Sequence, residues 1–583
     1  MKVFLQLGWF FKQERKSYIT GVILLLFVAL LQVIPPKVIG VIADHINEGT
    51  MTKKLLMEWM AVLIVTGMLM YGLRFYWRIM IFGSSVKLSK ILRDRLYHHF
   101  TNMSPAFYQK SRIGDLMAHA TNDLSAIQQT AGAGVLTLVD SLSTGGFVII
   151  AMAFTISWKL TLICLIPMPL MALLTSWFGT MLHKSFYKAQ GAFSSLNDKT
   201  QESIMGIKVI KTFGQEKEDI EDFRKQSEDV VQKNIVVAKI DSLYDPTISI
   251  LTGISFFLSI VFGAKYVLNG VLTIGELISF TTYLGLLIWP MLAFGWLFNI
   301  VERGRASYDR VTKLLSEKVD IQDQENARDV VPCGDIEYRL TSFTYPGETH
   351  PVLKDIQFSL ERGETLGIVG KTGSGKTTLL KLFIREFEGY KGEILFGGSK
   401  IADYKLDQLR GAIGYVPQDH FLFSANVEEN IAFANPAVKQ AEIEKAAKLA
   451  NIHDDILQFT HGYQTVVGER GVSLSGGQKQ RISIARALLM NPEVLILDDS
   501  LSAVDAKTEE AILASLKQNR KGKTTIITSH RLSAIQHANQ IIVLEEGTII
   551  ERGTHEELME LDGWYKNMYL HQQLEELVEL GGQ

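Results

Sequence analysis

Residues 370–378 read GKTGSGKTT and directly follow the apolar run TLGIV at 365–369. That run is typical of a buried strand, and the apolar residues LLKLFI at 379–384 favour a helix after the loop. Between a strand and a helix, the pattern G-x-x-x-x-G-K-[ST] predicts a phosphate-binding loop. Its residues are Gly370, Lys371, Thr372, Gly373, Ser374, Gly375, Lys376, Thr377 and Thr378. The alternative is a glycine-rich turn that binds nothing.

The residue types of this loop suit a nucleoside triphosphate with Mg²⁺. The glycines let consecutive backbone N–H groups turn toward phosphate oxygens, and the N-terminus of the next helix adds a partial positive charge. Lys376 is expected to reach the β- and γ-phosphates, and the Thr377 hydroxyl is expected to hold Mg²⁺.

The composition of the chain differs between its two halves. At 583 residues it exceeds the usual length of one domain. Long apolar runs fill the first half, whereas the second half has the pattern of a soluble α/β protein. A formal net charge of -3 gives no indication of a nucleic-acid partner. Two cysteines, Cys164 and Cys333, allow neither a disulfide framework nor a zinc site of the usual spacing.

Apolar segments in the first half predict membrane spans, because each approaches the length of about 20 residues that crosses the hydrocarbon core. Six are expected, near residues 18–41, 56–79, 134–156, 160–182, 247–268 and 274–300. A kink is expected at Pro35 and Pro36. The loops after the second and fourth spans are long, helix-patterned and rich in Lys and Arg, so the positive-inside rule puts them and both termini in the cytoplasm.

These patterns predict an all-α membrane domain with six spans at 1–317, a polar linker at 318–334 and an α/β nucleotide-binding domain at 335–583. The spans beside the long loops are expected to continue beyond the bilayer as long helices.

A second motif narrows the chemistry. Residues 474–478 read LSGGQ and precede a helical run, so Ser475, Gly476, Gly477 and Gln478 are expected to form an anion site at a helix start. In isolation the pattern equally fits an N-cap turn without a ligand. Its position about 100 residues after a phosphate loop, and before the apolar strand VLILD at 494–498, favours the ligand site.

With these two motifs and its six spans, the chain resembles a half-transporter of the ATP-binding cassette (ABC) exporters of type IV over nearly its full length. The resemblance implies an ATPase whose ATP hydrolysis drives transport. In that family two halves pair, and each of two ATP molecules lies between the phosphate loop of one half and the LSGGQ of the other.

The resemblance assigns roles to five further residues. Tyr345 resembles the aromatic residue that stacks on adenine, with an ordinary turn tyrosine as the alternative. Gln418 resembles the glutamine that contacts Mg²⁺ and the attacking water, and Asp498 would hold Mg²⁺ through oxygen ligation. Asp505 matches the loop that communicates between the two ATP sites. His530 matches the γ-phosphate histidine, although an isolated histidine is more often structural.

Asp499 departs from the family pattern, which has a glutamate after the Mg²⁺ aspartate to polarise the attacking water. An aspartate carboxylate lies about 1–1.5 Å further back, and general-base catalysis requires a reach of about 2.6–3.2 Å. The departure resembles the degenerate-site, BmrC-like halves of heterodimeric bacterial multidrug exporters. It implies slow hydrolysis at this chain's own site and a partner chain with the usual glutamate. A tolerated variant in a homodimer is the alternative. A largely regulatory subunit, with catalysis left to the partner, is compatible with the degenerate-site interpretation.

The resemblance implies two short coupling helices that contact the ATPase domains. Residues 206–214 resemble the lead-in to the second coupling helix, and residues 112–116 lie near the first. For the transported substrate, Asp140 in the third span is the first candidate, because intramembrane carboxylates are costly and commonly functional. It either attracts a cationic compound or pairs with another span. Trp296, with its aromatic neighbours in the sixth span, either lines a cavity or belongs to a lipid-facing band.

The predicted function is therefore ATP-driven export of amphiphilic drugs or xenobiotics across the cell membrane of a bacterium. Expected partners are a second half-transporter, the lipid bilayer and a hydrophobic or amphiphilic small molecule, with no nucleic acid. A homodimeric lipid or peptide exporter is the alternative within the family. Six spans argue against a soluble ABC ATPase, and a phosphotransferase would not need LSGGQ.

Overall fold

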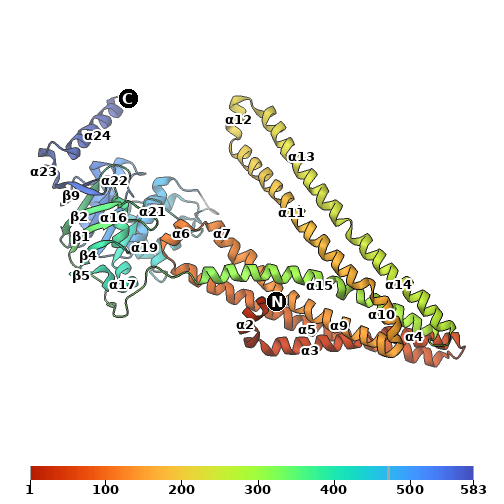
Figure 1. The fold of residues 1–583 in the computed structure, drawn as a ribbon. Coiled ribbons are helices and arrows are strands. Elements are labelled where there is room, and N and C mark those ends of the chain that lie inside the picture. The colour runs from red at the N-terminus through yellow and green to blue at the C-terminus, as the bar shows by residue number, and fades with distance from the viewer. Residues whose placement is uncertain (1, 469–472, 582–583) are drawn as a thin grey trace. The chain divides into compact units, whose positions relative to one another are not determined.

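The computed structural model describes residues 2–468 and 473–581, without the side chains of residues 294–295 and 576–581. The chain forms two compact units, which are described separately (Figure 1). The helical unit comprises Met1–Thr101 and Ile113–Glu317, and the sheet unit comprises Asn102–Arg112 and Lys318–Gln583.

The helical unit contains no strands among its described residues. Its helices are α1 (Lys2–Gln6), α2 (Gly8–Gln13), α3 (Arg15–Leu31), α4 (Ile34–Asn47), α5 (Lys53–Asn102), α7 (Ile113–Ala118), α8 (Leu124–Gln129), α9 (Val135–Met152), α10 (Trp158–Leu165), α11 (Pro167–Met205), α12 (Ile207–Phe213), α13 (Glu216–Asp241), α14 (Tyr244–Leu268) and α15 (Ile274–Leu315). The break between α3 and α4 lies just before Pro35 and Pro36, where the sequence predicts a kink.

Within the described residues, five helical runs are long and apolar enough to cross a membrane. They are Arg15–Asn47, Lys53–Asn102, Ile113–Leu165, Glu216–Leu268 and Ile274–Leu315. The expected fourth span at 160–182 differs, because it is divided between α10 and α11 at Ile166. Pro167 explains the division, since proline lacks the N–H donor that would continue the hydrogen bonding of α10.

Small and polar residues hold α15 against α4 along one face. Asp44 accepts hydrogen bonds from the Thr273 hydroxyl and the Gly275 N–H, both at 2.7 Å, and so caps the start of α15. One and two turns later, Ser279 donates to the Pro36 carbonyl at 2.9 Å and Tyr283 donates to the Val33 carbonyl at 2.6 Å. These bonds join the side chains of α15 to backbone carbonyls at the start of α4 and so hold the two helices together.

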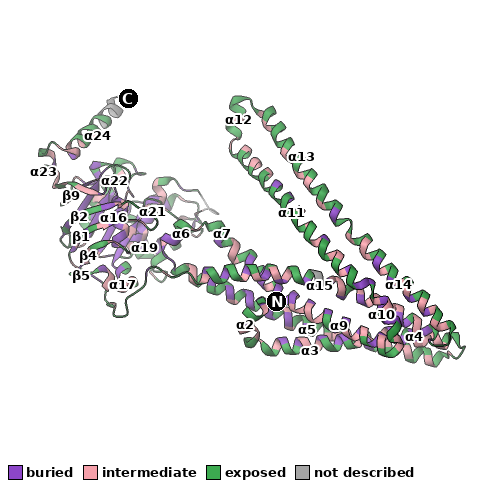
Figure 2. Cartoon of the chain, viewed as in Figure 1, coloured by how far each residue is buried: buried purple, intermediate pink, exposed green. Residues whose placement is uncertain are grey.

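Helices α11 and α13 pack on each other and leave most of their remaining surface exposed (Figure 2). Ile240 is the one buried residue of α13 among those described. Between the two helices, α12 is followed by Gly214, whose φ of 65° suits glycine in a helix C-cap. The short helix lies within the segment that resembles the lead-in to the second coupling helix.

The sheet unit contains two sheets. An antiparallel sheet has the order β2-β1-β4-β5, formed by β1 (Ile336–Phe343), β2 (Leu353–Leu360), β4 (Lys391–Phe396) and β5 (Ser399–Lys400). A six-stranded sheet has the order β10-β9-β3-β8-β7-β6, formed by β3 (Thr365–Val369), β6 (Ile413–Val416), β7 (Val494–Asp498), β8 (Thr524–Thr528), β9 (Gln540–Glu545) and β10 (Thr548–Gly553). In the second sheet the strands are parallel except for β10.

The sheet unit also contains helices, several of which pack on the six-stranded sheet. They are α16 (Lys376–Phe383), α17 (Leu406–Gly411), α18 (Val427–Ile431), α19 (Gln440–Leu449), α20 (His453–Gln458), α21 (Gly476–Leu489), α22 (Ala506–Asn519), α23 (His555–Glu560) and α24 (Trp564–Gly581). Alternate residues of β7 face two different cores: Val494 and Ile496 pack with the antiparallel sheet and α16, whereas Leu495 and Leu497 pack with α21 and α22. The sheet is therefore the middle layer of three, and its strands are buried on both faces.

A short helix from the first half of the chain belongs to the sheet unit. This helix, α6 (Pro105–Lys110), buries Ala106 in the core shared by β1, β2 and β3. Ser104, just before it, donates to the Asp320 carboxylate at 3.3 Å. The helix immediately precedes residues 112–116, near which the sequence predicts the first coupling helix.

Candidate functional site

The loop at 370–378 lies at the carboxyl end of β3 and opens α16. Gly370, Gly373 and Gly375 have φ values of 147°, 84° and 103°, which L side chains rarely adopt. A Cβ on Gly370 would lie 2.1 Å from the Leu544 carbonyl oxygen. The loop conformation therefore depends on glycine, as a cradle of backbone amides around phosphate oxygens requires.

Two polar side chains of this loop are buried without a charged partner. The Lys376 ammonium donates only to backbone carbonyls within the described residues, those of Gly370 at 2.8 Å and Lys371 at 3.1 Å. Burial lowers the pKa of Lys376, and the nearby carboxylates of Asp499 and Asp498 partly offset that shift. The Ser374 hydroxyl is buried and has no hydrogen-bond partner among the described residues. Both groups suit an anion that enters the loop.

Asp498 is the point where the loop meets the sheet. It is the last residue of β7 and is 1% exposed. The hydroxyls of Thr377 and Thr528 donate to its Oδ1 at 3.1 and 2.8 Å, and the Tyr415 hydroxyl donates to its Oδ2 at 3.0 Å. Burial, followed by the charge of Asp498, raises the pKa of Tyr415 and keeps its proton in place. Three parallel strands and α16 therefore fix one carboxylate.

Asp499 follows in the left-handed region, with φ 47°. Its N–H donates to the Thr528 hydroxyl at 3.0 Å and to the Thr528 carbonyl at 3.1 Å. The backbone of His530 donates to its carboxylate, but Oδ1 is buried with no partner within the described residues. Burial raises the pKa of Asp499, and interaction with His530 partly opposes the shift. The carboxylate lies near Lys376 and is held toward the backbone of His530, beyond the end of β8.

The turn at 475–478 forms the N-terminus of α21. The Ser475 hydroxyl accepts from the Gln478 N–H at 3.3 Å, and the Gln478 side chain accepts from the Ser475 N–H at 3.1 Å. This capping box uses a lone pair of the hydroxyl but leaves its proton free to donate to an anion. Ser475 and Gly476 are exposed. Both alternatives for this motif, an N-cap and an anion site, are therefore compatible with one geometry.

Gln480 joins this turn to the segment after β7. It is fully buried, donates to the Asp499 carbonyl at 3.5 Å and accepts from the Ala503 N–H at 3.1 Å. The carbonyl of Ala503 also lies so close to Gly477 that a Cβ there would be 2.9 Å from it. A shift of α21 would therefore be transmitted to the backbone beside Asp499.

The remaining residues singled out from the sequence lie around this site or beside it. The Tyr345 hydroxyl shares a 2.8 Å hydrogen bond with Thr378, and its ring packs edge-on against Phe343 and Phe387. Gln418 is exposed two residues beyond β6, and His530 is exposed two residues beyond β8. Asp505 caps α22 by accepting from the Thr508 N–H at 3.0 Å, an interaction that lowers its pKa.

The side chains fit MgATP in two respects. The glycine cradle and the unpartnered Ser374 hydroxyl suit phosphate oxygens, and Thr377 with Asp498 supplies hard oxygen ligands of the kind that Mg²⁺ prefers. The described residues contain no cluster of three His, Cys, Asp or Glu side chains that could hold a metal ion. Mg²⁺ would therefore arrive with phosphate oxygens that complete its coordination.

The two substrate candidates lie in the helical unit. Asp140, in α9, accepts from the Thr144 hydroxyl at 3.1 Å, and that hydroxyl also lies 3.4 Å from the Gln32 side-chain oxygen. Arg74 of α5 is close enough to attract the Asp140 carboxylate. Trp296 lies on α15 and is about half exposed. Asp140 therefore has a hydrogen-bond partner on its own helix and an attracting cation on α5, and its role toward a substrate stays a prediction.

Sequence reasoning missed Thr528, Tyr415 and Gln480. The first two lie on strands that flank β7 in the parallel sheet, and their roles follow only from the strand order. A signal did exist for them, because the carboxyl ends of parallel strands gather at one sheet edge. For Gln480 the signal was its position two residues after the end of LSGGQ, on the buried face of the helix that this motif begins.

Comparison with known proteins gives two family matches. Residues 18–291 match the ABC transporter transmembrane region, and residues 353–502 match the ABC transporter family. The Bacillus subtilis protein named Probable multidrug resistance ABC transporter ATP-binding/permease protein YheI is 48% identical over 569 residues, which cover 98% of this chain and 97% of the relative. The Escherichia coli Multidrug resistance-like ATP-binding protein MdlA is 48% identical over 577 residues, covering 99% and 97%.

A solved structure shares the fold. The bacterial Atm1-family ABC exporter with ATP bound superimposes with a TM-score of 0.79 at 23% sequence identity. The match covers 96% of this chain and 99% of that chain.

Proposed function

Because this chain belongs to the ABC transporters, as a type IV exporter with a membrane region fused to an ATP-binding region, we propose that it is one half of a dimeric exporter of amphiphilic drugs. It is a multi-pass membrane protein with bacterial multidrug-resistance-like relatives. We infer that both termini face the cytoplasm, since the basic loops obey the positive-inside rule in that orientation.

The proposal rests on one observation: the phosphate loop contacts Asp498 through the Thr377 hydroxyl. The same chain has helices long enough to cross a membrane. Lys376 and the loop amides would bind the phosphates, while Thr377, Asp498 and Gln418 would hold Mg²⁺. The metal would neutralise charge on the transferred phosphoryl group. His530 would contact the γ-phosphate, and Tyr345 would contact adenine.

Pairing with a second half is supported by two features. The signature turn at 475–478 keeps a hydroxyl proton and exposed amides available, as a site completed by another chain requires. The paired helices α11 and α13 also expose large apolar side chains, including Phe186 at 55% and Tyr187 at 76%. Exposed apolar surface of this kind favours contact with lipid or with a partner chain.

We further propose that the partner is a different chain with a glutamate at the position of Asp499. The Asp499 carboxylate is short and drawn toward the His530 backbone, so it is poorly placed to polarise a water molecule at the γ-phosphate. The intact Ser475–Gln478 turn would complete the competent site on the partner. This chain would then bind ATP at its own loop and hydrolyse it slowly.

ATPase measurements on the purified chain in lipid nanodiscs test whether the chain hydrolyses ATP and whether Asp499 makes its own site slow. Asp499→Glu is expected to raise turnover at least tenfold, since a positioned general base contributes about 10²–10⁴-fold. Asp499→Asn serves as the matched control that keeps the shorter length. Rapid turnover by the unaltered chain that Asp499→Glu does not increase would refute the degenerate site while leaving the exporter proposal intact.

The exporter itself is tested by co-expressing a second half-transporter that carries the usual glutamate and reconstituting the assembled pair. Lipophilic cations are expected to stimulate ATPase activity and to accumulate inside inverted vesicles when ATP is present. Lys376→Ala should lower ATP binding at this chain's own loop. If lipids or peptides stimulate the pair and no lipophilic cation does, the drug-export proposal is wrong.

A further inference from the structure

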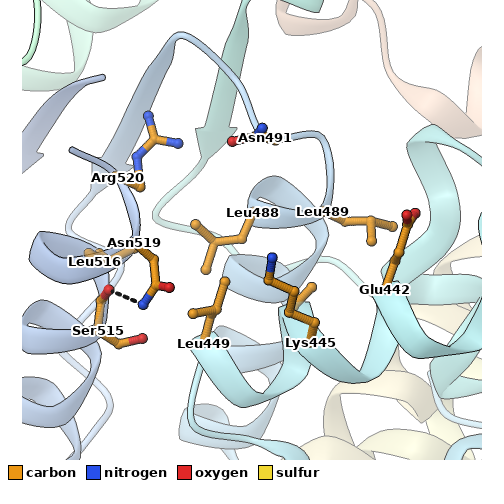
Figure 3. A pocket seen from close by; sticks show the side chains of 11 residues that line it. Glu442, Lys445, Leu449, Leu488, Leu489, Asn491, Ser515, Leu516, Asn519 and Arg520 are labelled. Carbon is orange, nitrogen blue, oxygen red and sulfur yellow. Dashed lines mark hydrogen bonds between the residues drawn. The ribbon is translucent and has the colours of Figure 1, made fainter. Parts of the chain in front are cut away.

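A cavity outside the ATP site lies between α19, the end of α21 and α22 (Figure 3). Its volume is about 380 Å³, within the range of small-molecule sites. Ala446 and four leucines form its apolar lining, the leucines being Leu449, Leu488, Leu489 and Leu516. The polar lining consists of Glu442, Lys445, Asn491, Ser515, Asn519 and Arg520.

Arg520 is the unusual member of this lining. It is only 7% exposed, yet no carboxylate of the described chain lies within 4.0 Å of its guanidinium. One terminal nitrogen donates to the Thr524 carbonyl at 3.1 Å, and Nε is buried with no partner in the described residues. Because buried charges are normally paired, this cation lacks its usual compensation.

The nearest acidic influence on Arg520 does not supply that compensation. Glu493 attracts Arg520 at longer range, but its own carboxylate accepts from Arg362 at 2.7 Å and pairs with Lys523 at 3.3 Å. Burial accordingly lowers the pKa of Arg520 to about 10, a value at which it stays charged near neutral pH. A buried, charged and underpaired guanidinium therefore lines an open cavity.

The other charged side chains define what would fit there. Figure 3 shows the Lys445 side chain extending from α19 toward Leu488, with Arg520 and Asn491 on one side of the leucines. Glu442 lies at the opposite wall, beside Leu489 (Figure 3). Two cations and one carboxylate leave the lining with a single net positive charge. A monoanion with an apolar body matches this lining better than a polyanion or a neutral molecule.

We propose that this cavity binds a small amphiphilic carboxylate, with the carboxylate at Arg520 and Lys445 and the apolar body against the leucines. The ligand would touch α19 and α21 on one side and α22 on the other. It would therefore join the helices of the LSGGQ region to the helix that follows Asp505, and so restrain their relative movement.

Calorimetric titration of the full chain in lipid nanodiscs, with empty nanodiscs as baseline, tests the proposal. The probe is 4-phenylbutyrate, and its uncharged amide is the matched control. The carboxylate is expected to bind saturably, and the amide at least about tenfold more weakly, because a hydrogen bond to a charged group is lost. Equal affinities for the two probes, or no saturable binding of the carboxylate, would overturn the proposal.

Variants of α19 locate the binding. Lys445→Glu is expected to weaken carboxylate binding at least tenfold, and Leu449→Trp should abolish it by filling the cavity. Lys448→Glu is the control, because Lys448 is exposed on the same helix but does not line the cavity. Retained ATP binding in each variant shows that the sheet unit is folded. Binding that persists in both Lys445→Glu and Leu449→Trp would place the ligand elsewhere and refute the site. No ATP hydrolysis or transport is needed, so failure of the export proposal leaves this test interpretable.

Discussion

Replacing Thr528 by valine removes one hydroxyl that joins the two aspartates of the candidate site. The hydroxyl donates to Asp498 at 2.8 Å and accepts from the Asp499 N–H at 3.0 Å. Valine has nearly the same shape, so no cavity forms. Asp498 loses one of three donors, and the Asp499 N–H keeps the Thr528 carbonyl at 3.1 Å. The cost is therefore one charge-assisted hydrogen bond, or about 1.5–3 kcal/mol.

Two measurements check this value. Thermal unfolding of the purified chain should occur roughly 3–12 °C lower, since 1 kcal/mol corresponds to about 2–4 °C in a domain of this size. The Mg²⁺ concentration needed for half-maximal ATPase activity should rise about 10–100-fold, as it does when outer partners of a metal ligand are removed.

Thr525→Val is the matched control, because Thr525 is buried on the same strand and its hydroxyl makes no hydrogen bond among the described residues. It should leave both the unfolding temperature and the Mg²⁺ dependence close to those of the unaltered chain. If the two variants behave alike, the link from Thr528 to Asp498 does not stabilise the site, and the reasoning fails.

Three further substitutions have definite outcomes. Gly370→Ala should abolish binding of a fluorescent ATP analogue, because the added Cβ would lie 2.1 Å from the Leu544 carbonyl; normal binding would contradict the cradle geometry. Ser475→Ala should remove a cap of about 1 kcal/mol and reduce ATPase activity of the assembled exporter, but leave ATP binding at this chain's own loop unchanged. Tyr283→Phe loses the 2.6 Å bond to Val33 and should destabilise the membrane helices by about 0.6–1.7 kcal/mol without changing ATP affinity; an unchanged unfolding temperature would count against that bond.

The elements nearest the ATP loop were predictable from sequence because their signals are local. A strand at 365–369, glycine positions that need positive φ and a helix opening at Lys376 all follow from a dozen residues. The membrane-length helices and the kink at the double proline are equally local. The division of the fourth span at Ile166 was missed, because a hydropathy pattern averages over Pro167 and does not register its lost N–H.

The surroundings of Asp498 were not predictable in this way. Tyr415 and Thr528 reach it only because β6 and β8 flank β7, and strand order is a property of the whole sheet. The cavity at Arg520 was even less predictable from the sequence. It depends on how three helices pack, and nothing in the local sequence distinguishes this arginine from the exposed ones.

The place of α6 in the sheet unit has a consequence for synthesis on the ribosome. Ala106 is made early, but Leu544, which belongs to the same core, is among the last strand residues to emerge. At about 5–20 residues per second, that separation corresponds to roughly 20–90 s of translation. During this interval α6 has been synthesised but lacks the strands against which Ala106 packs. A fragment that starts at residue 318 would lack α6, and the apolar surface that Ala106 covers would be exposed to water. Such fragments are therefore expected to be less soluble.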